Sequence, residues 1–278
     1  MSHVSQHRDP LTSDGYDPNR RKERKNSSDS KHPADDHQEF KMVHIFAVIV
    51  LGSQALLYMW TSREGPITLT QTYVKATNTG WMQSTEPFCQ IKLTHILAMY
   101  LCVACVHHTF ALTKYDHYMG LLCKYGYNPY RWTEYFCTSP FMVIAVALVL
   151  GVRDVHQLFL LAVCQAATIV FGLIWEKRKQ SMLEHILGWV PFGAEWFVIY
   201  WHYFNMIQRS TASVTSFVHV FVNSQFVLFC LFGVVQLLQG LRYGPLTNAM
   251  HVDACYVFLS LTAKSLMGIT VFAGMLLV

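Results

Sequence analysis

Charged residues are scarce in this sequence of 278 residues: they make up 14% of it, whereas hydrophobic residues make up 53%. A soluble domain usually needs more charge than this on its surface, so the composition indicates a membrane protein. Apolar residues are in turn scarce in residues 1–41, which contain the basic run RRKERK. Such a segment cannot bury enough apolar surface to fold, so we expect a disordered basic tail over residues 1–41.

A secretory signal is also lacking. The chain does not show the short succession of basic, apolar and small residues that such a signal requires. We therefore expect the first apolar run to be a true helix of the mature protein. No internal repeat and no second folded domain can be recognised, so residues 42–278 are predicted to form one membrane domain.

Apolar runs long enough to cross a bilayer occur seven times. A helix needs about 20 mainly apolar residues to span the hydrocarbon core. The segments that meet this requirement are 42–60, 91–112, 130–150, 156–175, 186–207, 214–239 and 254–278. The sequence thus predicts an all-α membrane protein with seven transmembrane helices and with its two termini on opposite sides.

Lys and Arg are distributed unequally between the two sides of the membrane. The tail and the loops near 113–132, 176–185 and 240–253 carry fifteen of them, and the loops on the other side carry four. Because Lys and Arg are retained in cytoplasmic loops, we expect a cytoplasmic N-terminus and an extracellular C-terminus. The same charges favour contact with an anionic inner leaflet over binding to nucleic acid.

The first outer loop, residues 61–90, is the one long connection in the sequence. Its segment ITLTQTYV, residues 67–74, alternates in polarity as a half-buried strand does, and the turn-prone TNTG, residues 77–80, follows. We expect a small β-hairpin here that lies over the outer mouth of the bundle.

Ionisable residues are rare in the predicted helices, and each invites a functional explanation. Lys264 lies in the middle of the last helix, too deep for its amine to reach either surface comfortably. Glu134 and Glu195 are the membrane carboxylates that could pair with it. Lys264 is then either a structural lysine, neutral or paired with Glu134, or a nucleophilic amine that condenses with an aldehyde to a Schiff base. A protonated Schiff base is a buried cation and requires a counterion.

Two motifs around these residues resemble a known family. Residues 130–135 read YRWTEY and look like the RWxEY motif of heliorhodopsins, and residues 260–265 read SLTAKS and look like their SLxAKS motif. The lysine in the last helix, the carboxylate in the third helix and the inverted orientation also resemble this group of microbial rhodopsins. The resemblance covers roughly residues 42–278.

The resemblance implies a light-absorbing photoreceptor that is not an enzyme and that holds all-trans retinal on Lys264, with Glu134 as the counterion. Ser260 and Thr138 would contact this polar centre. The residues implied to line the polyene and ring, all of types that also simply pack in membrane helices, are Met142, Gln165, Phe192, Phe229 and Phe232. The family further implies a slow photocycle, a homodimer in the cell membrane and, with the basic inner surface, a cytoplasmic signalling partner.

The sequence departs from the family near the expected Schiff base. Residues 51–54, LGSQ, stand where the family often has a histidine, and Val103 replaces a serine one turn before His107. Glu195 is not a position at which the family carries a carboxylate. Because membrane carboxylates and histidines relay protons, Glu195 with His107 and His108 suggests light-gated proton conduction as an alternative. A carboxylate that only hydrogen-bonds a neighbouring helix is the structural explanation.

A metal-dependent enzyme is a more distant alternative. His107, His108 and His117 resemble part of the histidine boxes of membrane di-iron oxygenases, which need several such boxes on one side of the membrane. The other histidines here are scattered along the chain. Cys102 and Cys105 form a CxxC without a second pair, which favours packing over zinc binding. We therefore predict no metal site.

Overall fold

The computed structural model describes residues 33–61, 64–178, 181–211 and 216–276. These residues form eight α-helices, one short 3-10 helix and one antiparallel sheet of two strands. The chain divides into two compact units, Met1–Glu39 and Phe40–Val278. Most of the predicted disordered tail, residues 1–32, lies outside the described residues.

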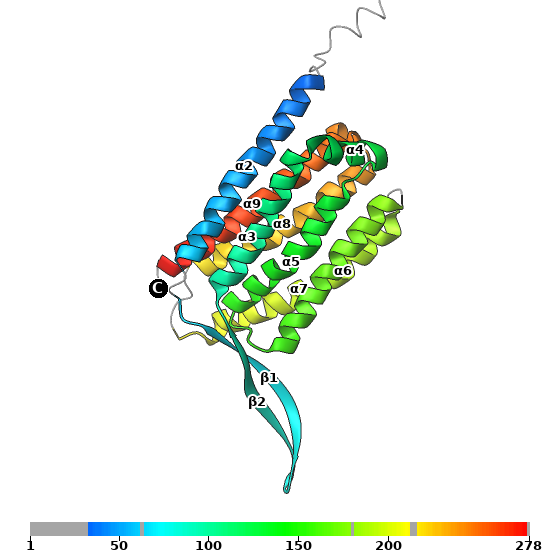
Figure 1. Cartoon of the computed structure of the whole chain (residues 1–278). Coiled ribbons are helices and arrows are strands. Elements are labelled where there is room, and N and C mark those ends of the chain that lie inside the picture. The colour runs from blue at the N-terminus through cyan, green and yellow to red at the C-terminus, as the bar shows by residue number, and fades with distance from the viewer. Residues whose placement is uncertain (1–32, 62–63, 179–180, 212–215, 277–278) are drawn as a thin grey trace, which may run out of the picture. The chain divides into compact units, whose positions relative to one another are not determined.

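Long helices follow the seven predicted apolar segments (Figure 1). They are α2 (Pro33–Trp60), α3 (Leu93–Thr113), α5 (Pro129–Val149), α6 (Val155–Lys177), α7 (Met182–Arg209), α8 (Ser216–Gly240) and α9 (Ala249–Leu276). Within the described part of the chain, six of them are long and apolar enough to cross a membrane. The exception is α7, because its tryptophans, tyrosines, Pro191 and Glu195 lower its mean hydropathy. The prediction of a helical membrane protein is confirmed.

The first long helix begins at Pro33 rather than at residue 42, so residues 33–41 are helical and not disordered. Phe40 is buried, and its ring packs against the rings of His44 and Tyr118 with centroid distances of 4.5 and 6.0 Å. Tyr118 belongs to α4 (Tyr115–Tyr125), a short helix that was not predicted. The contact with Tyr118 extends α2 beyond its apolar run. It could not be predicted, because α4 has 11 residues and is too short to span a membrane.

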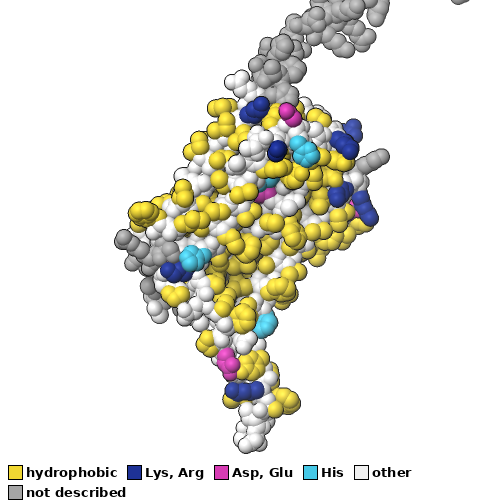
Figure 2. Space-filling view, viewed as in Figure 1, with side chains coloured by type: hydrophobic (Ala, Val, Ile, Leu, Met, Phe, Trp, Pro, Cys, Tyr) yellow, Lys and Arg dark blue, Asp and Glu magenta, His cyan; other side chains and the backbone are white. Residues whose placement is uncertain are grey.

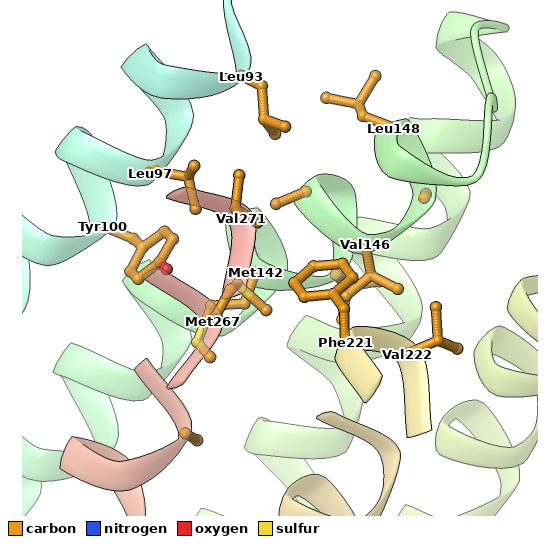
Figure 3. Close-up of a cluster of buried hydrophobic side chains, with 14 of the residues drawn as sticks. Leu93, Leu97, Tyr100, Met142, Val146, Leu148, Phe221, Val222, Met267 and Val271 are labelled. Carbon is orange, nitrogen blue, oxygen red and sulfur yellow. The ribbon is translucent and has the colours of Figure 1, made fainter. Parts of the chain in front are cut away.

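A cluster of buried apolar side chains fills the bundle between α3, α5, α8 and α9 (Figure 3). Leu97, Met142, Phe221 and Met267 are members of this cluster, and each is at most 3% exposed. Because lipid is as apolar as these side chains, close van der Waals packing between the helices, rather than exclusion of water, is what stabilises the cluster. Met267 lies one turn beyond Lys264, so the cluster closes one end of the region that surrounds this lysine.

The predicted hairpin is present in the loop between α2 and α3. It consists of β1 (Ile67–Thr77) and β2 (Gly80–Ile91), and Thr77 pairs with Gly80 across the turn. Figure 1 shows, however, that the hairpin extends away from the helices, and most of its residues are exposed. The expectation that it lies over the mouth of the bundle is therefore wrong. The exposed side chains of the strands include polar residues and also large apolar ones such as Val74, Trp81 and Phe88.

The foot of the hairpin is tied to the start of α6. The backbone N–H of Thr70 donates to the carbonyl of Arg153 at 2.9 Å. The next residue, Asp154, caps α6 by accepting hydrogen bonds from the N–H groups of His156 and Gln157 at 2.9 and 3.1 Å. Partial desolvation opposes these bonds, but together they hold the pKa of Asp154 below its usual value.

Charge and hydropathy are segregated on the surface. Figure 2 shows one face, on which hydrophobic side chains cover the middle of the bundle and Lys and Arg side chains gather towards the end where α4 lies. We call this end the α4 end. The helices α2, α5, α7 and α9 begin there, and the hairpin lies at the other end (Figure 1).

Glycines allow close contacts between helices. Gly274 on α9 tests the packing of α9 against α8. A Cβ at Gly274 would lie 2.6 Å from the ring of Phe217, whereas a Cβ at Gly193 would meet no atom within 4 Å. We expect Gly274→Ala to lower the free energy of unfolding by about 1–3 kcal/mol through overpacking. Gly193→Ala should leave it unchanged or raise it slightly, because alanine favours helix. Thermal unfolding of the two purified variants measures the difference, and equal midpoints would contradict the packing of α8 against α9.

Candidate functional site

A buried ion pair joins α9 to α5. The amine Nζ of Lys264 lies 3.1 Å from Oε1 of Glu134, and the two side chains are only 4% and 3% exposed. Nζ also donates a hydrogen bond to Oγ of Ser260. Thr138 Oγ1 donates to the same Glu134 oxygen at 3.0 Å. The structure therefore brings together the four residues that the sequence placed at the polar centre.

Helix geometry explains why these groups meet. Asn128 caps α5 by accepting a hydrogen bond from the N–H of Tyr130 at 3.0 Å, so the helix starts at Pro129 and Glu134 is inside it. Thr138 lies one turn further on the same face. On α9 the side chain of Lys264 points back towards the start of the helix and reaches Ser260, one turn earlier.

A long cavity begins at this ion pair. It contains about 850 Å³ of space free of protein atoms, part of which is open to solvent. Its wall includes eight of the nine residues that the resemblance implied for the cofactor, and only Glu134 is absent from it: Lys264, Ser260, Thr138, Met142, Gln165, Phe192, Phe229 and Phe232. A mainly apolar cavity with one amine at its wall fits a long, apolar aldehyde such as retinal.

Tryptophan rings lie against glycines along the walls of the cavity. The indole of Trp132 on α5 packs against Gly172 on α6, where a Cβ would lie 2.6 Å from the ring. The indole of Trp189 on α7 packs against Gly233 on α8, with a corresponding distance of 2.4 Å. A larger residue at either glycine would push an indole into the cavity, so these glycines help to define the space that a ligand occupies.

The part of the cavity nearest the α4 end has a polar lining. His185 Nδ1 lies 3.1 Å from Oε1 of Gln236, and Trp189 Nε1 donates to His185 Nε2 at 3.1 Å. Gln236 Nε2 donates in turn to the carbonyl of Gly172 at 3.2 Å. Because Nε2 accepts, Nδ1 carries the proton of a neutral His185. This network connects α6, α7 and α8.

A second buried ionic group lies nearer the α4 end. Arg131 Nη2 donates to both carboxylate oxygens of Glu176 at 2.9 Å, and Nη1 pairs with Asp253. All three side chains are at most 2% exposed. Trp132 Nε1 donates to Glu176 at 2.5 Å, and Tyr118 donates to Asp253 at 3.1 Å. We call Arg131, Glu176 and Asp253 the arginine cluster.

Another cavity adjoins the arginine cluster at the α4 end. It contains about 1130 Å³ of space free of protein atoms, part of which is open to solvent. Glu176 and Gln239 line it, and Gln239 Nε2 donates to Glu176 at 3.2 Å. We call it the end cavity.

The remaining sequence candidates do not line the long cavity. His108 is buried, and its Nδ1 is 2.8 Å from Nδ1 of His44 on α2. His107 packs against the ring of Tyr118 at a centroid distance of 5.9 Å. Glu195 is 1% exposed, and neither of its carboxylate oxygens has a hydrogen-bond partner among the described residues.

Among the described residues, the histidines do not form the box that an oxygenase requires. His107 and His108 have the different neighbours named above, and His117 bonds the hydroxyl of Tyr130 at 3.2 Å. Within the described residues, no three His, Cys, Asp or Glu side chains are grouped closely enough to hold a metal ion. Cys105 instead donates to the carbonyl of Val48 at 3.7 Å and packs against the core.

Several residues of the site were missed from the sequence, although helical periodicity could have found some of them. Tyr135 and Ser139 share a face of α5 with Arg131 and line the long cavity. Trp189 and His185 also line it, one and two turns before Phe192 on α7. No local signal could have found His44, because its partner is 64 positions away.

The comparisons with known proteins agree with this geometry. A sequence model of the heliorhodopsin family matches residues 40–276. The chain belongs to the heliorhodopsin family. It is therefore a multi-pass membrane protein of the retinal-binding photoreceptor kind, and the resemblance seen in the two motifs is confirmed. No curated protein matches the chain.

Solved structures of microbial rhodopsins share the fold of this heliorhodopsin. A thermophilic rhodopsin has a TM-score of 0.61 at 14% identity, over 86% of this chain and 93% of that one. A cyanorhodopsin from Calothrix sp. NIES-2098 has a TM-score of 0.59 at 14% identity, over 84% and 93%. A light-driven proton pump from Leptosphaeria maculans has a TM-score of 0.58 at 10% identity, over 86% and 96%. At these identities the likeness shows the fold alone.

The charges of the arginine cluster predict an asymmetry between two substitutions. Arg131→Gln leaves two buried carboxylates without a cation, which should lower the free energy of unfolding by about 3–5 kcal/mol. Asp253→Asn leaves one carboxylate beside one guanidinium, so it should lower the free energy of unfolding by clearly less than Arg131→Gln does. Thermal unfolding of the purified variants compares the two. An Arg131→Gln variant as stable as Asp253→Asn would show that the carboxylates are not held by Arg131.

Proposed function

We propose that this heliorhodopsin is a photoreceptor that holds all-trans retinal on Nζ of Lys264 as a protonated Schiff base, with Glu134 as the counterion. The observation that carries this proposal is the buried amine of Lys264, 3.1 Å from a carboxylate, at the wall of a long apolar cavity. A lysine that served only to pair with Glu134 would not need such a cavity beside it.

Retinal supplies visible absorption and a light-driven isomerisation, and the chain supplies the environment of Nζ. Glu134 stabilises the positive charge on Nζ, and Thr138 orients the carboxylate by donating to Oε1. Ser260 accepts a hydrogen bond from Nζ. The face of the Tyr135 ring, whose centroid is 5.2 Å from Nζ, adds cation–π stabilisation. Charges held in so dry a site interact more strongly than in water.

The orientation follows from the positive charge at the α4 end. Because cytoplasmic loops retain Lys and Arg, we assign the α4 end to the cytoplasm and the hairpin to the outside of the cell membrane. We include α7 as the seventh span. It contributes Phe192 and Trp189 to the long cavity beside spans α6 and α8, which supports its place within the membrane.

Signalling is the role that this arrangement supports best. The basic α4 end and the end cavity form the surface that a cytoplasmic partner would contact. A slow photocycle would give that partner time to respond to the changed charge on Nζ. A homodimer, as the family implies, would present two such surfaces.

The retinal linkage is tested by reconstitution and chemical trapping. Purified protein supplied with all-trans retinal should develop a visible band, and Lys264→Ala should remain colourless because it lacks the amine. Lys177→Ala, at the end of α6, is the matched control and should keep the colour. Borohydride reduction followed by peptide mass spectrometry should place the retinyl group on Lys264. A colourless wild type, or colour in Lys264→Ala, would refute the proposal.

Light-gated proton conduction is a second candidate function, and Glu195 is the observation that favours it. Its carboxylate is buried in α7 without a hydrogen-bond partner among the described residues. Purely structural carboxylates in membranes are normally paired. Gln165, which lines the long cavity, and Trp196 beside Glu195 also have buried polar atoms without a partner in the described chain. Of these three groups, Glu195 is the one that can take up and release a proton, whereas the amide and the indole N–H can only form hydrogen bonds.

Photocurrent in voltage-clamped cells tests this second function. If Glu195 carries protons, Glu195→Gln should reduce the current at least about tenfold, because an amide cannot take up and release the proton. Glu86→Gln, an exposed carboxylate on the hairpin, is the control and should leave it unchanged. A wild type without photocurrent rules out conduction, and a current that survives Glu195→Gln removes Glu195 from the pathway.

A further inference from the structure

The arginine cluster holds more negative than positive charge. Two carboxylates, Glu176 and Asp253, face the single guanidinium of Arg131, and all three groups are buried. An excess charge in a low-dielectric environment is costly, and protonation of one carboxylate relieves it. The role proposed above for Lys264 and Glu134 makes no use of this cluster.

Helix α9 aligns the cluster with the Lys264 amine. Asp253, Tyr256, Ser260 and Lys264 succeed one another along one face of the helix, over about 16 Å. A hydrogen-bond donor is present at each end of this row of residues. Nζ of Lys264 donates to Ser260, and the hydroxyl of Tyr118 donates to Asp253 at 3.1 Å.

Contacts between side chains also link the two sites. Tyr135 lines the long cavity beside Lys264, and its hydroxyl donates to the carbonyl of Tyr256 at 2.9 Å. The ring of Tyr256 lies 4.4 Å from the guanidinium carbon of Arg131. Trp132 lines the same cavity and donates to Glu176. These contacts offer a direct route from the long cavity to the cluster.

The opposite side of the cluster faces water. Glu176 lines the end cavity, which is partly open to solvent, and Gln239 on the same wall holds its carboxylate by a bond of 3.2 Å. A proton bound in the cluster therefore has a short exit to the α4 end.

We propose that the arginine cluster is the port through which Nζ of Lys264 exchanges its proton with the α4 end of the molecule. The proposal rests on the proposed function, in which light weakens the hold of Nζ on its proton. In the outgoing step the N–H bond at Nζ breaks, its electron pair stays on nitrogen, and an O–H bond forms on Asp253. One positive and one negative charge disappear together. Exchange with water follows when the O–H bond on Asp253 breaks and an O–H bond forms on Glu176, which passes the proton to water in the end cavity. The return step reverses these changes.

The groups around the cluster suit this task. Tyr118 from α4, Trp132 and Tyr135 from α5, Gln239 from α8 and Tyr256 from α9 surround it, and all of them are neutral. Arg131 is the cation in contact with the carboxylates among the described residues. Behind Tyr118 lie His44 and His107, with ring centroids 5.6 and 5.9 Å from its own. With two carboxylates and one guanidinium, the cluster carries one excess negative charge, which a proton from Nζ would neutralise.

Time-resolved absorption of the full chain with retinal tests the port. In Asp253→Asn the return of the proton to Nζ should slow at least about tenfold, because the group that relays it is lost. Sodium azide, a small weak acid that can enter the end cavity, should restore the rate, which it would not do for a merely structural defect. Asp116→Asn removes an exposed carboxylate from α4 and should behave as wild type.

Infrared spectra give a second measurement on the carboxyl itself. While Nζ lacks its proton, the wild type should show the C=O stretch of a newly protonated carboxylic acid, and Asp253→Asn should not. In the retinal-free protein the same band should appear on acidification and be absent from Asp253→Asn.

The outcomes separate the two proposals. A wild type that forms no visible band overturns the proposed function and the port with it. A coloured protein in which Asp253→Asn recovers as fast as Asp116→Asn, or in which the carboxyl band is unchanged by the substitution, overturns the port alone. Slower recovery that azide does not correct also overturns it, because Asp253 then acts only through the fold.

Discussion

The pairing of Lys264 with Glu134 is the constraint on which the rest of the bundle depends. A charge in a dry interior is tolerable only beside its partner, so α5 and α9 must keep their faces together at this level. Everything around the pair serves to keep it dry and fixed. The apolar cluster of α3, α5, α8 and α9 closes one side, indoles seated on glycines form the walls, and the arginine cluster occupies the other side.

Much of the fold was predictable because its signals are local. A run of about 20 apolar residues is written directly in the sequence, and so is the turn that joins two alternating strands. Lys264 and Glu134 could be found because a charge is conspicuous among apolar neighbours. Phe192 and Phe229 were assigned through the family resemblance, and periodicity alone would not have separated them from other aromatic residues that simply pack.

The parts that escaped prediction depend on contacts between distant segments. His44 pairs with a residue on another helix, and Arg131 finds one carboxylate on α6 and another on α9. Nothing near Arg131 in the sequence distinguishes it from the Lys and Arg residues of the cytoplasmic loops. The charge count that set the orientation therefore included it among them. The same holds for α4, whose inner face is defined by the ends of α2 and α9. The direction of the hairpin likewise depends on its foot at α6 rather than on its own residues.

The two ion pairs between α5 and α9 are opposite in sense. Along α5 the cation Arg131 precedes the anion Glu134, whereas along α9 the anion Asp253 precedes the cation Lys264. A lengthwise slip of one helix against the other would part both pairs at once. Such charge patterns are a well-attested means of fixing helix register. The apolar surfaces of this membrane domain would tolerate many alignments of α5 against α9. The two ion pairs together select a single alignment.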